Sequence, residues 1–187
     1  MNNLIKRGEG KKAILMLHGR GGSAEDIISL SHNFDATSYA FTANNNAWYP
    51  MPFMRARNLN EPYLSESLNQ IKEAIEFIRK NHDEVFVLGF SQGACLALEI
   101  GAMEDLRGVI AFSGGFIGED NELLSSVKTK NVFISCSFED PFIPLKRAQD
   151  SAKIYEYKGA KVFTNFYAGQ SHHITPKDIK IAREIID

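Results

Sequence analysis

The sequence predicts an α/β protein built on a mostly parallel, doubly wound sheet, and three observations support this prediction. Six short runs rich in β-branched and aromatic residues alternate with segments of helical periodicity. Most of these runs are continuously apolar, which is typical of parallel strands covered on both faces. The chain has 187 residues, 44% of them hydrophobic, which suffices for one core but not for two ordinary domains. We therefore expect one compact domain, residues 1–187.

The expected elements follow each other in β-α order. The strands are 13–17 (AILML), 38–43 (SYAFTA), 85–89 (VFVLG), 108–113 (GVIAFS), 131–137 (NVFISCS) and 161–167 (KVFTNFY). The helices are 24–33, 65–81, 92–103, 144–158 and 176 to the end. Ser23 and Thr175 are suitable N-caps, and Pro176 suits the first position of the last helix. Because parallel strands need right-handed crossovers, ligand sites should lie at their carboxyl ends, where stretches 44–64 and 114–130 leave the sheet and can wall a pocket.

The charge pattern excludes a nucleic-acid interface. The net charge is −2, and the basic residues occur as scattered pairs such as Lys6-Arg7 and Lys11-Lys12, which is typical of solvated surface. The apolar block near the start, residues 13–17, is too short for a signal-peptide core or a membrane span. We therefore expect a cytoplasmic protein with no membrane span and no nucleic-acid partner.

The two cysteines do not indicate a metal or disulfide site. Cys95 and Cys136 fall inside expected buried elements, and their spacing is not that of metal ligands. Cys95 follows the serine of the next motif by four residues, so it should share a helical face that points into the core. We expect it to contribute packing.

The stretch GFSQG, residues 89–93, has the G-x-S-x-G pattern of a nucleophile elbow. The pattern alone is a weak signal, because glycine and serine are common in this chain. Its context is stronger: a predicted strand precedes Ser91, a predicted helix follows it, and glycines flank the turn. Ser91 is therefore the candidate nucleophile, and an ordinary turn serine is the alternative.

Two later loops carry the groups that a serine nucleophile needs. Asp140 follows strand 131–137 in SFEDPFIP, and His172 and His173 follow strand 161–167 in GQSHHITP. A histidine accepts the serine proton and a carboxylate holds the histidine in the right tautomer. The chain order Ser, Asp, His is that of an α/β-hydrolase. Glu139 beside Asp140, and His173 beside His172, remain alternatives for the acid and the base.

The loop HGRGGSAEDI after the first strand has two interpretations. Its glycines let the backbone turn tightly and present N–H groups, as an oxyanion-binding wall requires. Residues 19–24 also fit G-x-G-x-x-A, the dinucleotide-binding fingerprint. That fingerprint expects a carboxylate at the end of the second strand, where Thr42-Ala43-Asn44 stands instead. We therefore set nucleotide binding aside. His18, at the start of this loop, is expected to be a structural hydrogen-bonding residue at the pocket floor.

Four motifs together resemble the phospholipase/carboxylesterase family of α/β-hydrolases, which includes the acyl-protein thioesterases, in its short bacterial form. They are HGRGGS, GFSQG, DPFIP and GQSHHI, and the resemblance runs along nearly the whole chain. The intervening WYPMPF is similar to the tryptophan-containing loop of bacterial members. In this resemblance Asp140 matches the acid of the D-x-x-V-P motif, with Ile143 in the valine place. His172 matches the base of G-x-G-H-x-I, with Ser171 where the second glycine is usual. The resemblance implies that the oxyanion donors are the backbone N–H groups of Arg20 and Gln92.

The resemblance also implies an activity. Family members hydrolyse short acyl esters, lysophospholipids and acylated proteins through an acyl-enzyme, and the mechanism needs neither a metal ion nor an organic cofactor. We expect a serine carboxylesterase acting on small acyl esters, with thioesters and lysophospholipids as further substrates. The alternative is a catalytically silent hydrolase fold that binds a small ligand, although such a protein normally lacks a triad member.

The stretch 44–64 supplies the candidate substrate-binding residues. We expect the side chains of Trp48, Tyr49, Phe53 and Met54 to line the acyl pocket, and simple packing is the alternative. Arg55 and Arg57 follow in the same stretch. They could meet an acidic group of a substrate, but a solvated loop is the interpretation that we favour.

Overall fold

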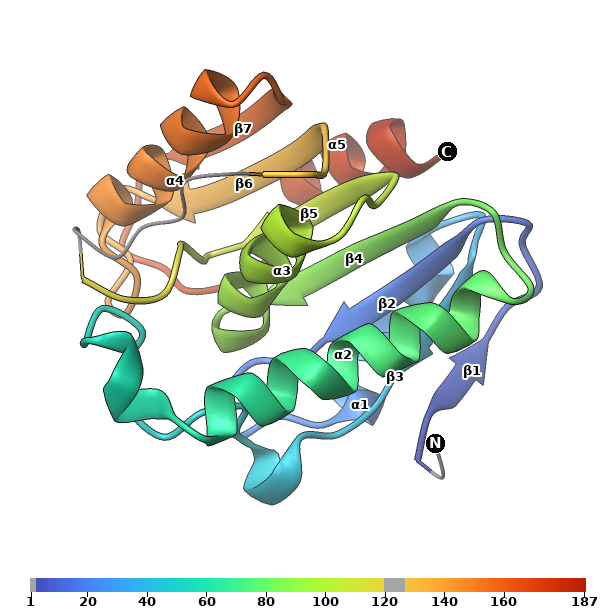
Figure 1. Cartoon of the computed structure of the whole chain (residues 1–187). Helices are drawn as coiled ribbons and strands as arrows, with labels where there is room; N and C mark the ends of the chain where they lie inside the picture. Colours follow the sequence, from blue (N-terminus) through green and yellow to red (C-terminus); the bar gives the residue numbers. More distant parts are fainter. Residues whose placement is uncertain (1–2, 120–126) are drawn as a thin grey trace.

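The computed structural model describes residues 3–119 and 127–187, whose strands form one seven-stranded sheet in the order β1-β3-β2-β4-β5-β6-β7 (Figure 1). The strands are β1 (Ile5–Arg7), β2 (Ala13–Leu17), β3 (Thr37–Ala40), β4 (Val85–Phe90), β5 (Gly108–Phe112), β6 (Asn131–Ser137) and β7 (Lys161–Tyr167). Only β1 is antiparallel to its neighbour. The prediction of a mostly parallel sheet is confirmed.

Helices cover both faces of the sheet (Figure 1). On one face lie α2 (Tyr63–Arg79), α3 (Gln92–Met103) and α4 (Leu145–Tyr157), and on the other lie α1 (Ala24–Ile28) and α5 (Pro176–Ile186). Three short 3-10 segments are η1 (Ser29–Asn33), η2 (Asn44–Asn46) and η3 (Arg57–Asn60). Since strands β2, β4, β5 and β6 are sandwiched, their side chains are buried on both faces, except for half-buried residues at one end of β4 and of β6.

Most expected elements are confirmed, and the differences have local causes. The strand expected at 38–43 is Thr37–Ala40, because the chain leaves the sheet early and the Ala43 amide donates to His18 Nε2 at 3.0 Å. The helix expected at 24–33 is α-helical only to Ile28. Side-chain bonds from Ser29 and His32 to nearby carbonyls accompany the tighter 3-10 turn that follows. Strand β1 was not predicted because it has only three residues, of which Lys6 and Arg7 are exposed, and these carry no apolar pattern.

The caps predicted from sequence are present. Ser23 and Thr175 each accept a hydrogen bond from the amide three residues on, and each forms a capping box with an aspartate. These boxes fix where α1 and α5 begin, and both helices begin directly after loops of the candidate site. Across residues 3–119 and 127–187, no helix is long and apolar enough to cross a membrane.

Candidate active site

Ser91 occupies a strained turn between β4 and α3. Its backbone torsions are φ 54° and ψ −118°, in a region that non-glycine residues rarely adopt. The turn is held because the Ser91 amide donates to the Phe112 carbonyl at 2.9 Å. A Cβ at Gly89 would overlap the Gly93 carbonyl, and a Cβ at Gly93 would overlap the Leu17 carbonyl. The two glycines of GFSQG are therefore required by close backbone approach.

Asp140 and His172 form a buried pair. His172 Nδ1 lies 2.8 Å from Asp140 Oδ2 and 3.0 Å from Oδ1. The Asp140 side chain is fully buried, whereas 14% of the His172 side chain is exposed. Asp140 Oδ1 also accepts from the amides of Phe142 and Ile143, both at 2.9 Å. The carboxylate is thus oriented by its own loop before it orients the imidazole.

His172 and the adjacent His173 lie in different surroundings. The His172 ring lies between the rings of Phe90 and Phe142, each with its centroid at 4.9 Å. His173 is exposed, and its carbonyl accepts from the Tyr167 hydroxyl at 3.1 Å. Glu139 is exposed as well. Of the alternatives that the sequence left open, the structure brings together Asp140 and His172.

Several of the predicted site residues line one pocket of about 430 Å³. Ser91 and His172 line it, together with Arg20, Gln92 and the predicted Phe53. The remaining lining residues are Gly19, Tyr49, Pro50, Met51, Pro52, Phe90, Cys95, Phe142 and Ile143. The wall is therefore mainly apolar, with polar groups gathered near Ser91.

Trp48 and Met54 are not among the residues that line this pocket. Trp48 is buried, and its indole N–H donates to the His18 carbonyl at 2.8 Å, so it supports the wall from behind. Met54 is 40% exposed. For Trp48 the structure favours the alternative of packing, whereas the surface position of Met54 agrees with neither expectation. Of the stretch 114–130, residues 120–126 lie outside the described residues. Gly118 supports the wall indirectly by donating to the Phe53 carbonyl at 2.7 Å.

The backbone N–H groups of Arg20 and Gln92 are free to bind a substrate oxygen. Among the residues that the structure describes, neither amide has an acceptor, and both residues line the pocket. Gln92 is the first residue of α3, so its N–H is one of the unpaired groups at a helix N-terminus. Such amides attract negative charge.

The side chains of Arg20 and Gln92 clamp the pocket wall. Arg20 donates to the carbonyls of Tyr49 at 2.6 Å and Pro50 at 3.1 Å. Gln92 accepts from the Trp48 amide at 2.9 Å and donates to the Tyr49 carbonyl at 2.8 Å. The two residues with free amides thus also hold the segment that faces Ser91.

In the pocket wall and behind it, buried groups are kept neutral or are paired. Burial raises the pKa of the Cys95 thiol to about 12 and raises the pKa of Tyr49 well above its ordinary value. Neither group is ionised near neutral pH. Arg57 forms an ion pair with Glu99 at 3.0 Å, in which the Glu99 side chain is fully buried. The expectation of a solvated Arg57 is therefore wrong.

His18 acts as a structural residue. Its Nδ1 lies 2.7 Å from the Gly19 carbonyl, and its Nε2 accepts from the Ala43 amide. Burial lowers the pKa of His18, an effect that the hydrogen bond to Gly19 and the charge of Asp26 partly oppose. The neutral ring ties the loop that carries Arg20 to the end of β3.

Sequence reasoning missed several pocket residues. Pro50, Met51 and Pro52 belong to the WYPMPF motif and Phe142 to DPFIP, but none of the four was singled out, whereas Tyr49 was expected to line the pocket and does. These residues adjoin, in the sequence, residues that were predicted to line the pocket or to act in catalysis, and this position could have identified them. Glu99 was also missed, although a lone carboxylate inside the apolar helix ACLALEIGAM indicates a buried partner.

Comparisons with known proteins agree with this geometry. The Phospholipase/Carboxylesterase family matches residues 4–187. A crystal structure of a phospholipase/carboxylesterase from Dyadobacter fermentans is 37% identical, covers 99% of this chain and 96% of its own, and has a TM-score of 0.91. A Bacillus cereus carboxylesterase shares the fold at 19% identity and a TM-score of 0.70, covering 97% and 91% of the two chains.

A curated relative extends the comparison to a eukaryote. Acyl-protein thioesterase 1 of Debaryomyces hansenii is 24% identical over 214 residues, which cover 95% of this chain and 90% of that protein. Family membership accounts for the α/β-hydrolase fold and for a hydrolase of the carboxylesterase or thioesterase type. The chain belongs to the phospholipase/carboxylesterase family, and it is a serine hydrolase of carboxylic esters.

Proposed function

We propose that this protein is a carboxylesterase that hydrolyses small acyl esters through an acyl-enzyme on Ser91. In this proposal His172 is the general base and acid, and Asp140 orients it. The observation that carries the proposal is the buried Asp140–His172 pair beside the same pocket as Ser91, whose backbone is strained. Strain maintained by the surrounding structure is common at catalytic residues.

Acylation follows from the tautomer of His172. Because Asp140 accepts from Nδ1–H, the lone pair of the neutral ring is on Nε2, which takes the proton of Ser91 as Oγ attacks the carbonyl carbon. The carbonyl oxygen becomes an oxyanion between the backbone N–H groups of Arg20 and Gln92. Each such donor contributes about 3 to 4 kcal/mol to lowering the barrier in comparable enzymes.

Release of the leaving group and the deacylation that follows use the same groups. The protonated His172 gives its proton to the leaving oxygen or sulfur, and the acyl group stays on Ser91 as an ester. Water then enters and gives a proton to His172 as its oxygen attacks the acyl carbon. The bond between this carbon and Ser91 Oγ breaks, His172 returns the proton to Oγ, and the acid leaves. These steps need no metal ion and no organic cofactor.

The pocket supports a small-molecule substrate. Its volume of about 430 Å³ and its wall of Tyr49, Met51, Phe53 and Cys95 suit an uncharged acyl chain of modest length. Thioesters and lysophospholipids present the same acyl carbonyl and are further candidate substrates. We place this reaction in the cytoplasm, where unpaired cysteines such as Cys95 and Cys136 are usual.

The test is hydrolysis of p-nitrophenyl esters of increasing acyl length by the native protein and by Ser91→Ala. We expect turnover by the native protein and a loss of about 10⁴-fold or more in kcat/KM in the variant, as triad removal causes in related enzymes. Ser65→Ala, at an exposed position of α2, is the matched control and should retain native activity. Undiminished activity of Ser91→Ala would contradict the proposal.

A further inference from the structure

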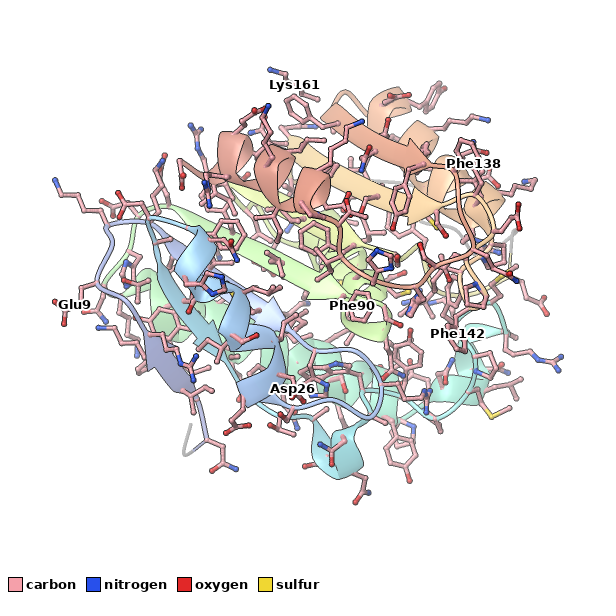
Figure 2. The ribbon with its side chains drawn as sticks, turned by 180° about the vertical axis from the view of Figure 1, so that it is seen from behind. Glu9, Asp26, Phe90, Phe138, Phe142 and Lys161 are labelled. Atoms are coloured by element: carbon pink, nitrogen blue, oxygen red, sulfur yellow. The ribbon has the colours of Figure 1, made fainter. Side chains whose placement is uncertain are left out.

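A second hollow of about 300 Å³ adjoins the acyl pocket. It shares three of its residues with that pocket, namely Gly19, Arg20 and Phe90. The other lining residues are His18, Gly22, Asp26, Ile27, Leu30 and Ile174. Figure 2, the view from behind, labels Asp26 and Phe90 of this hollow together with Phe142 of the acyl pocket. The mechanism proposed above leaves this hollow unused.

The hollow lies beside the proposed base. The ring of Phe90, which borders both spaces, is 4.9 Å from the ring of His172, centroid to centroid. Ile174, two residues after His172, forms part of the wall. His172 is not itself a lining residue, so a group bound here contacts the Phe90 ring that packs against the imidazole, which must protonate the leaving atom.

The geometry of a tetrahedral intermediate assigns the two spaces different roles. Besides Ser91 Oγ, the acyl carbon carries the oxyanion, the acyl chain and the leaving group, and these point in different directions. The first pocket holds both oxyanion residues, Arg20 and Gln92, and the apolar wall opposite Ser91. With the acyl chain there, the leaving group extends toward His172 and Phe90.

The walls of the hollow select an uncharged apolar group. Ile27 is buried, while Leu30, Phe90 and Ile174 are half-buried members of the apolar layer between the sheet and helices α1 and α5. Asp26 contributes a carboxylate, whose Oδ2 accepts from the Ser23 amide and hydroxyl at 2.8 Å. An anionic leaving group would be repelled by this charge, whereas an alkyl or aryl group would bury apolar surface.

We propose that the hollow formed by Ile27, Leu30, Phe90 and Ile174 binds the alcohol part of the ester, and that it favours uncharged apolar alcohols. This proposal rests on the esterase function proposed above. The enzyme then binds the two parts of its substrate in separate spaces, with the acyl chain in the first pocket and the alcohol in the hollow.

The test compares two ester series. The first keeps the butanoyl group and changes the alcohol from methanol to butanol to hexanol, whose intrinsic leaving abilities are similar. The second keeps the methyl ester and lengthens the acyl chain. For the native protein we expect kcat/KM to rise by about tenfold from the methyl to the hexyl ester, the order of effect that one or two well-bound methylenes produce.

Leu30→Trp should fill the hollow and abolish the rise in the alcohol series, with the acyl series unchanged. Leu30→Ala removes part of the wall, and it should reduce the rise about threefold, so the test does not depend on one variant folding. Leu59→Trp, at an exposed leucine outside both spaces, is the control and should behave as native.

The proposal is overturned if the native protein shows no rise with alcohol length. It is also overturned if the Leu30 variants alter the acyl series and not the alcohol series. These results differ from failure of the esterase function itself, in which Ser91→Ala would keep the native activity toward every ester.

Discussion

Asp140 combines two roles that its neighbours cannot share. Its Oδ1 accepts from two amides of its own loop, and its carboxylate faces Nδ1 of His172 at 2.8–3.0 Å. Glu139 is exposed, and no amide of the described residues donates to its side chain. Asp140 is therefore positioned to accept a hydrogen bond from Nδ1–H of His172, and Glu139 is not.

Asp140→Asn should lower kcat by about 10⁴-fold with little loss of stability. An amide can donate to Nδ1, which would force the imidazole into the tautomer with its proton on Nε2 and remove the acceptor for Ser91. The measurement is ester hydrolysis at pH 8 together with thermal unfolding. Glu139→Gln is the matched control and should retain activity within about twofold, since surface changes have small effects. Equal losses in the two variants would contradict the assignment.

The choice between His172 and His173 illustrates what residues alone could predict. The motif pointed to the first histidine, and the structure gives the reason: its ring lies between Phe90 and Phe142 and faces Asp140. No periodicity in the sequence reveals this, because two adjacent residues in a loop can point in any direction. The triad was predictable as a set, but the ring contacts were not.

At the level of elements, a buried ion pair joins three segments. Glu99 on α3 accepts from Arg57 of η3 at 3.0 Å and from the Ile117 amide at 2.8 Å. Arg57 in turn donates to the Ile117 carbonyl at 2.9 Å. The helix that begins after Ser91 therefore holds the end of the pocket-wall segment and the loop after β5.

Arg57→Met should destabilise the protein, and more at pH 8 than at pH 5. Burial raises the pKa of Glu99, and the charge of Arg57 opposes that rise. A carboxyl group whose folded-state pKa is raised costs stability as the pH rises through that pKa, and removing Arg57 enlarges the cost. We expect a loss of about 3 kcal/mol in the free energy of unfolding at pH 8 and a smaller loss at pH 5, where Glu99 can take up a proton.

Urea denaturation at the two pH values measures this effect. Arg79→Met is the matched control, because the Arg79–Glu104 pair is partly exposed on both sides. Its loss should stay below about 1 kcal/mol and depend little on pH. A loss in Arg57→Met that is larger at pH 5 than at pH 8 would contradict the role of the buried charge.

Which side chains of stretch 44–64 face the pocket could not be predicted from the sequence. The stretch 44–64 was expected to wall a pocket, and Phe53 does line it, but Trp48 faces the interior and Met54 is exposed. These orientations depend on partners distant in sequence, such as the side chains of Arg20 and Gln92 that fix residues 48–50. Irregular segments without periodicity give no sign of which side chain turns inward.

At the level of the whole molecule, the parallel sheet explains why the site could be predicted so far. Strands β4, β6 and β7 all end at the same edge, so Ser91, Asp140 and His172 meet although they are far apart in the chain. The strand pattern of the sequence predicts this edge of the sheet. The acyl pocket and the hollow beside it depend on loop packing, which no pattern in the sequence encodes. That residues 1–187 form one domain stays a prediction.

The most direct test of the central claim is covalent labelling with an alkyl phosphonofluoridate, which phosphonylates activated serines, followed by peptide mapping. We expect one adduct per chain, on the peptide that contains Ser91, and loss of ester hydrolysis in proportion to labelling. His172→Ala should react far more slowly, because its serine lacks a base. An adduct on another serine, or full ester hydrolysis after complete labelling, would contradict Ser91 as the nucleophile.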